Sequence, residues 1–215
     1  MAKIKTLDQL QDALDKEMAW RVKEIGTFRV GSKSNGDQRK PLIRAGIALL
    51  YAHWEGFIKC SSESYLEFVE SRGLKYTDLK TCFSVFGLKG KLDTLADARK
   101  SEANIAAIDF IMAELGNTAK LQISSAIRTD SNLTSKVFKN IAKSMDISTE
   151  PYETKFNLID NSLVDRRNKV AHGEFLEIGG QDFGKLIDEI LSLMRTYKTD
   201  LENAASQQTF KRQAA

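Results

Sequence analysis

Proline is scarce in this chain, whose 215 residues include only Pro41 and Pro151. Because proline lacks a backbone N–H, it is tolerated in the first turn of a helix and avoided in the interior. Both prolines stand before stretches whose apolar residues recur at helical spacing. This scarcity favours a protein that is nearly all helix.

Cysteine and histidine are equally scarce, with two of each: Cys60, Cys82, His53 and His172. Two cysteines are too few for a disulfide scaffold, and neither they nor the histidines have the spacing of a metal site. The sequence also lacks metal-site motifs such as H-E-x-x-H or paired aspartate ligands. We therefore expect no metal site, no cofactor and a reducing, cytoplasmic location.

Long apolar runs are missing as well. The most apolar stretch, residues 47–52, is far too short to span a bilayer, and the N-terminal residues lack the apolar run of a signal peptide. The expectation is a soluble protein with no membrane partner. Its net charge of +3, from 32 basic and 29 acidic residues, permits an RNA partner without requiring one.

The apolar residues recur at helical spacing along most of the chain. Helices are predicted over about 6–28, 41–71, 105–115, 137–145 and 183–201, with shorter pieces over 78–86 and 89–98 and a further helix after Pro151. Residues 120–132 lack clear periodicity and are predicted to form an irregular insertion. We expect one all-α domain over residues 1–215, whose polar tail, about 204–215, is disordered.

One short stretch brings together residues suited to phosphate chemistry. Residues 165–174 read DRRNKVAHGE, and Arg167, Asn168 and His172 follow the pattern R-N-x-x-x-H. A guanidinium binds phosphate through two parallel hydrogen bonds, and an imidazole titrates near neutral pH. If Gly173 lies just past the helix end, His172 sits at the C-terminus, where the macrodipole favours its protonated form.

This stretch resembles the signature of the HEPN superfamily, R-x(4–6)-H with a polar residue after the arginine. A second stretch, residues 51–57 with the sequence YAHWEGF, resembles the early helix of a prokaryotic HEPN-like nuclease subfamily. The resemblance implies an all-α HEPN-type bundle, a homodimer whose two motif helices form one cleft, and a metal-independent endoribonuclease. It also implies a toxin–antitoxin, phage-defence or RNA-processing setting, with an inhibitory protein or antitoxin as a further partner.

In such an enzyme the 2′-hydroxyl of the RNA substrate attacks the adjacent phosphate. Arg167 and His172 are the predicted catalytic residues, with Asn168 orienting the phosphate or His172. The main alternative is a non-catalytic HEPN module that binds RNA, a nucleotide or a protein partner, because family membership does not guarantee activity. On bare spacing alone, a purely structural role for the motif also stays open.

Further residues are predicted to have supporting roles. Glu55 is predicted to orient Arg167 or Arg166, with a solvent-facing position or a contact with Lys59 as its alternative. His53 is expected in packed surroundings, with a structural or a supporting task. RNA contacts are assigned to Arg166 and Lys169 and to a stripe of three lysines that an ordinary solvated face would equally explain: Lys136, Lys139 and Lys143.

Overall fold

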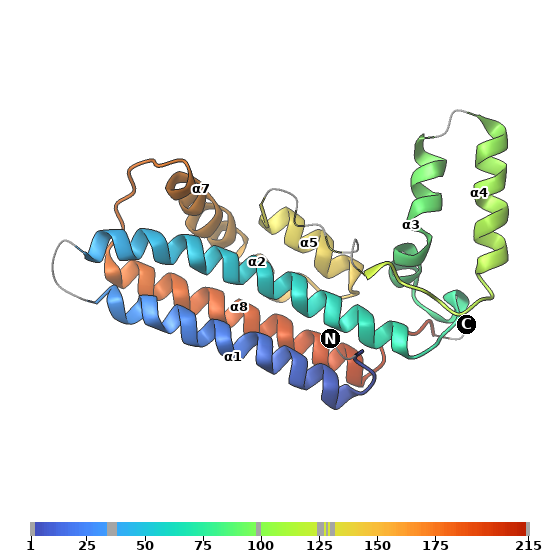
Figure 1. The fold of residues 1–215 in the computed structure, drawn as a ribbon, viewed down its shortest axis with the longest axis horizontal. Coiled ribbons are helices and arrows are strands. Elements are labelled where there is room, and N and C mark those ends of the chain that lie inside the picture. The colour runs from blue at the N-terminus through green and yellow to red at the C-terminus, as the bar shows by residue number, and fades with distance from the viewer. Residues whose placement is uncertain are drawn as a thin grey trace.

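Three long helices lie side by side and form the body of the protein (Figure 1). The computed structural model describes residues 3–33, 38–97, 100–123, 127, 129 and 132–213. Helices α1 (Leu7–Gly31), α2 (Arg39–Ser71) and α8 (Gly180–Ser206) pack against one another along their lengths. The predicted all-α class is confirmed, and the described residues contain isolated β-bridges but no strand.

Local sequence signals set the ends and spacing of these helices. Thr6 and Gln9 form a capping box, in which the Thr6 side chain accepts a hydrogen bond from the Gln9 backbone N–H and the Gln9 side chain accepts one from the Thr6 backbone N–H. Gly46 allows α8 to approach α2, because a Cβ at this position would lie 2.5 Å from Cζ of Phe183. The close packing of two helices at Gly46 thus occurs within a single chain.

Shorter helices cover one side of α2. They are α5 (Ser135–Ser144), α6 (Glu150–Glu153), the π-helical segment η3 (Leu158–Val164) and α7 (Asp165–Ala171). On the same side, α3 (Thr81–Asp97) and α4 (Ser101–Glu114) project from the body as an arm (Figure 1). The short 3-10 helix η1 (Tyr76–Asp78) precedes α3. Pro151 lies in the first turn of α6 and not directly before the motif helix.

Two predictions about local order were wrong. Residues 81–97 form one helix rather than two pieces, because Gly87 continues it and packs closely against Tyr76. The tail from residue 204 to 213 is not disordered: Phe210 is fully buried, and Lys80 and Arg212 form backbone hydrogen bonds with Phe210 and Asp78, respectively. Burial of one aromatic ring and pairing of the backbone hold this polar segment in place.

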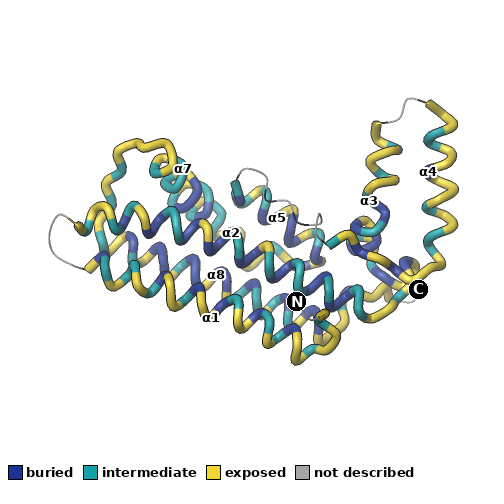
Figure 2. The backbone as a smooth tube through the Cα atoms, in the orientation of Figure 1, coloured by how far each residue is buried: buried dark blue, intermediate teal, exposed yellow. Residues whose placement is uncertain are grey.

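The predicted insertion over residues 120–132 lies partly outside the described residues, at 124–126, 128 and 130–131. Within its described part, Leu121 and Ile127 are buried in the core, as is Leu133 directly after it. Figure 2 shows the buried positions concentrated between the long helices and beneath α5 and α7, whereas most of the arm is exposed or half-buried. Across the described ranges, no helix is long and apolar enough to cross a membrane.

Candidate functional site

The motif residues lie on a helix that changes its winding just before them. Residues Leu158–Val164 are π-helical, and α7 continues from Asp165 without a break. The wider turn brings Ile159, Leu163 and Val164 all into the core. Such segments occur frequently at functional sites because they redirect the side chains that follow. Here the segment sets the direction in which Arg167 and Asn168 leave the helix.

The end of α7 is a complete Schellman motif at the predicted place. Gly173 has φ +73°, its N–H donates to the Val170 carbonyl at 3.1 Å, and the Glu174 N–H donates to the Lys169 carbonyl at 2.9 Å. His172 is the C-cap residue and its side chain is exposed. The prediction that Gly173 ends the helix beside His172 is therefore confirmed.

Arg167 is held by two neighbours. Its guanidinium lies over the ring of Tyr51, 4.2 Å from Cζ to the ring centroid, and its Nη1 donates to Oδ1 of Asn168 at 2.8 Å. The arginine is half-buried. A guanidinium has five N–H donors in a fixed plane, so these two contacts fix its orientation and leave donors for an anion. Asn168 therefore positions Arg167, a role that the sequence did not predict.

Tyr51 links α7 to the core helix α2. Its ring is buried, and its hydroxyl accepts a hydrogen bond from the backbone N–H of Leu133 at 2.7 Å. Burial raises the pKa of Tyr51, and the nearby Glu55 carboxylate raises it further, against the opposing effects of Leu133 and Arg167. A neutral, fixed phenol ring is a suitable platform for a guanidinium. The only sequence signal for this role was the presence of Tyr51 within the YAHWEGF stretch.

Glu55 does not make the predicted contact with an arginine. Among the described residues, Glu55 forms no ion pair with Arg166, Arg167 or Lys59. Its carboxylate instead raises the pKa of Tyr51, which lies one helical turn earlier. The direct bridge was wrong because the Tyr51 ring occupies the position against the guanidinium. Glu55 is half-buried and lies on the same helix as Tyr51, whose ring is against Arg167.

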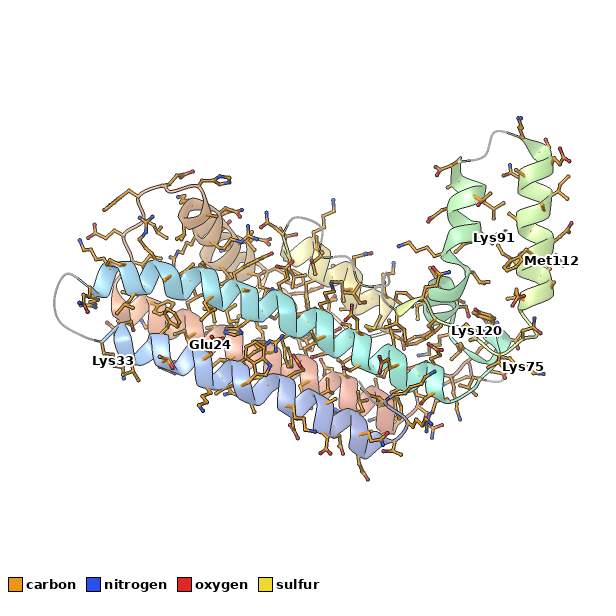
Figure 3. The ribbon with its side chains drawn as sticks, in the orientation of Figure 1. Glu24, Lys33, Lys75, Lys91, Met112 and Lys120 are labelled. Atoms are coloured by element: carbon orange, nitrogen blue, oxygen red, sulfur yellow. The ribbon has the colours of Figure 1, made fainter. Side chains whose placement is uncertain are left out.

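His53 lies on the other side of α2, packed against α1. Two residues along a helix are about 160° apart around its axis, so His53 points away from the face that carries Tyr51. Its ring is 3% exposed, its Nε2 is 2.9 Å from Oε2 of Glu24 (labelled in Figure 3), and the ring meets Trp20 edge-on. Burial lowers the pKa of His53, although Glu24 opposes this effect. His53 therefore does not belong to the site around Arg167.

The basic residues separate into two groups. Arg166 and Lys169 lie on α7, half-buried and exposed, respectively. The three lysines of α5 are exposed and line a groove of about 930 Å³ between α3 and α5. The two groups are structurally connected, because the Asp160 carboxylate accepts from the backbone N–H and the hydroxyl of Ser135, at 2.7 and 2.6 Å, at the start of α5.

The chemistry that these residues offer is that of an acid–base group and an anion clamp on one short helix. An exposed imidazole at a helix end and an oriented guanidinium lie five residues apart in sequence, which is about 1.4 helical turns. In the part of the chain that the structure describes, no group of three or more His, Cys, Asp or Glu side chains could hold a metal ion. What the arrangement supports is proton transfer and stabilisation of charge on phosphate oxygens.

Comparison with known families gives a match to the model of RiboL-PSP-HEPN, over residues 16–203. The matched region includes both the YAHWEGF stretch and the motif helix. Neither the comparison with curated proteins nor that with solved structures gave a match.

Proposed function

Because this chain belongs to the RiboL-PSP-HEPN family, we propose that it is a metal-independent endoribonuclease. One observation carries the proposal: Arg167 is fixed by Tyr51 and Asn168 on the same short helix that ends at the exposed His172. Contacts that orient an arginine while leaving donors available suit a phosphate-binding role better than a structural one. Asn168 and Tyr51 act as positioning residues.

In the proposed reaction, the 2′-oxygen of RNA attacks the adjacent phosphorus and the bond to the 5′-oxygen breaks. The products are a 2′,3′-cyclic phosphate and a free 5′-hydroxyl, and no water or metal is consumed. The 2′-hydroxyl loses a proton and the leaving 5′-oxygen gains one, and His172 carries out this proton transfer in exchange with the solvent. Arg167 stabilises the charge on the phosphate oxygens. DNA lacks the 2′-hydroxyl and is not cut by this route.

Phe175 extends this site toward the bases of the substrate. The side chain is 79% exposed and lies three residues after His172. The segment around it is held in place, because Leu176 and Ile178 pack against the core and Glu177 pairs with Lys40 at 2.9 Å. An exposed aromatic ring on a fixed segment can stack on an unpaired base. We therefore assign single-stranded RNA as the substrate class.

The test is incubation of the purified protein with single-stranded RNA, matched duplex RNA and single-stranded DNA, with and without EDTA. We expect cleavage of the single-stranded RNA alone, unaffected by EDTA, with cyclic-phosphate and 5′-hydroxyl ends. Loss of activity in EDTA, or 5′-phosphate ends, would contradict the mechanism. Binding of RNA without cleavage would assign the protein to the non-catalytic alternative.

A further inference from the structure

Arg44 is a half-buried arginine in the first half of α2. Within the described residues it forms no ion pair and no hydrogen bond, whereas Arg29, for example, pairs with Asp188 at 2.6 Å. Its guanidinium nitrogens reach solvent, because no Arg44 nitrogen is both buried and without a hydrogen bond. A guanidinium carries five N–H donors. The donors of Arg44 are therefore available to a ligand that approaches from solvent.

Apolar contacts fix the stem of this side chain. Arg44 lines a narrow crevice between α2 and the segment after α7, together with Ile43, Ile47, Leu176 and Ile178. The two α2 isoleucines are buried, and the two residues of the segment pack against the core. An arginine stem can lie along apolar surface while its charged head stays in water. The crevice thus holds the Arg44 guanidinium at its edge, which reduces the entropy lost when a ligand binds.

The acidic residue of this segment that lies nearest the crevice in sequence is already paired. Glu177 stands between Leu176 and Ile178, and its carboxylate lies 2.9 Å from Nζ of Lys40. Lys40 lowers the pKa of Glu177, so the carboxylate stays ionised beside the lysine. Of the charged groups Lys40, Arg44 and Glu177, the first and the last offset each other. One positive charge, that of Arg44, remains.

Arg44 lies on the same face of α2 as Tyr51, the ring over which Arg167 lies. The two α2 residues are seven positions apart, which corresponds to about 700° of rotation and about 10.5 Å of rise. Their side chains therefore leave the helix in directions only about 20° apart. The residues between them, AGIALL, include no charged or polar side chain. Two guanidinium groups thus lie on one side of α2, separated by uncharged surface.

This separation fits the backbone of single-stranded RNA. Each step from one phosphorus to the next contains six single bonds and spans at most about 7 Å, twice the reach of the three bonds of an amino-acid residue. A distance of about 10.5 Å is longer than one such step and shorter than two. Phe175, which is 79% exposed, directly precedes Leu176 of the crevice. A strand whose base stacks on Phe175 therefore passes close to Arg44.

We propose that Arg44 is a second phosphate-binding residue, which holds the phosphodiester two steps from the one that Arg167 binds. It guides single-stranded RNA along α2, between α7 and the segment that leads from α7 to α8 (Figure 1). Arg44 touches the substrate away from the reacting bond, so it is a positioning residue and transfers no proton. The proposal rests on the proposed function for the identity of the ligand, RNA, but it does not require cleavage.

The salt dependence of RNA binding tests the contact, because each neutralised phosphate releases counterions. Binding of a fluorescent single-stranded RNA is measured in the His172→Ala background at several salt concentrations. We expect Arg44→Met, which keeps an apolar stem, to raise Kd at least about fivefold and to lower the slope of log Kd against log[salt] by about 0.7. Arg44→Lys keeps the charge and should retain the slope. Circular dichroism checks that each variant stays folded.

Arg195→Met is the matched control. Arg195 is exposed on α8 and lies seven residues after Asp188, which pairs with Arg29 of α1. It therefore lies on the α1 side of α8, away from α7 (Figure 1). Removal of this charge should change neither Kd nor the slope. An equal change in the control and in Arg44→Met would show that net charge alone, and not a contact at Arg44, causes the effect.

Substrate length separates phosphate binding from a structural role in the protein with His172 intact. A dinucleotide has a single phosphate and cannot engage Arg44, whereas a strand of about six nucleotides can. Arg44→Met should raise KM for the longer strand and cleave the dinucleotide like the wild type. Equal losses on both substrates, or an unchanged salt slope in folded Arg44→Met, would overturn the proposal.

Failure of the proposal and failure of the nuclease function have different outcomes. Cleavage of RNA that does not depend on Arg44 would leave the nuclease function in place and overturn the role of Arg44. Binding of RNA that depends on Arg44, without cleavage by the wild type, would support the role of Arg44 and contradict the nuclease function. Absence of RNA binding by the wild type would overturn both.

Discussion

The guanidinium of Arg167 lies over the ring of Tyr51, with 4.2 Å between Cζ and the ring centroid. This contact joins the motif helix to the core helix α2, and it places a buried ring beneath a half-buried charge. A cation over an aromatic face gains about 0.5–2 kcal/mol, depending on how far it is desolvated. Tyr51 therefore decides where Arg167 points.

Removal of the Tyr51 ring should impair the proposed cleavage without removing any catalytic group. We expect Tyr51→Leu to lower kcat/KM for RNA by about 2- to 30-fold, which corresponds to the loss of a cation–π contact. Tyr51→Phe keeps the ring and should retain activity, although loss of the acceptor for the Leu133 N–H costs about 1–3 kcal/mol of the free energy of unfolding. Equal activities of the two variants would show that the ring does not position Arg167.

His172 is exposed at the end of α7, so its removal should affect chemistry and not folding. We expect His172→Ala to lower kcat by about 10²–10⁴-fold, the usual loss for a general acid or base, with an unchanged melting temperature. Arg167→Ala should also abolish cleavage. The exposed neighbour Lys169 is expected to matter less, and Lys169→Ala should lower the rate far less than His172→Ala does. Wild-type rates in folded His172→Ala protein would remove His172 from the site.

Substitution of Phe175 should separate stacking from simple apolar contact. Binding is measured by fluorescence anisotropy on a single-stranded RNA in the His172→Ala background, which prevents cleavage. We expect Phe175→Ala and Phe175→Leu to weaken binding by about 5- to 150-fold, the equivalent of about 1–3 kcal/mol for one stacked base, and Phe175→Trp to preserve it. If Leu binds RNA as well as Phe does, the contact is not a stack.

Two glycines in the long helices form a matched pair for a test of packing. A Cβ at Gly46 would lie 2.5 Å from the Phe183 ring, whereas nothing lies within 4 Å of a Cβ at Gly184. We expect Gly46→Ala to lower the free energy of unfolding by about 1–3 kcal/mol through overpacking. Gly184→Ala should raise it by up to about 1 kcal/mol, since alanine favours helix. Urea denaturation of the two variants measures both changes, and equal effects would contradict the close approach at Gly46.

His53 should make the protein less stable in mild acid. Burial against α1 lowers the pKa of His53 in the folded state. Glu24, whose carboxylate faces the ring, raises this pKa, and Arg21 lowers it. The unfolded chain, with a histidine pKa of about 6.5, therefore binds the proton more readily than the folded protein below that pH. The free energy of unfolding should fall as the pH drops from about 6.5 toward the folded-state pKa, and this contribution should be constant above that window.

Urea denaturation near neutral pH and at about pH 5.5 measures this dependence. His53→Gln removes the titrating group and should flatten that part of the pH profile. His172→Gln, at an exposed position, serves as the control and should leave it in place. An unchanged slope in His53→Gln would show that other groups cause the loss of stability.

The sequence by itself determined the features that depend on neighbouring residues. The capping box at Thr6 and Gln9, the Schellman turn at Gly173 and the long helix over 39–71 all arise from contacts within a few residues. Backbone geometry and helical periodicity determine such contacts, so a single sequence reveals them. The HEPN resemblance likewise depended on short strings, and the family match over residues 16–203 agrees with it.

Only the tertiary structure decided which distant side chains meet. Tyr51 and Arg167 are 116 positions apart in the sequence, and no periodicity shows that a ring, and not the Glu55 carboxylate, lies against the guanidinium. The same holds for His53, which packs on α1, and for Phe210, whose burial orders a tail of polar composition. Such contacts depend on how whole helices pack, because each side chain takes the neighbours that the packed faces bring to it.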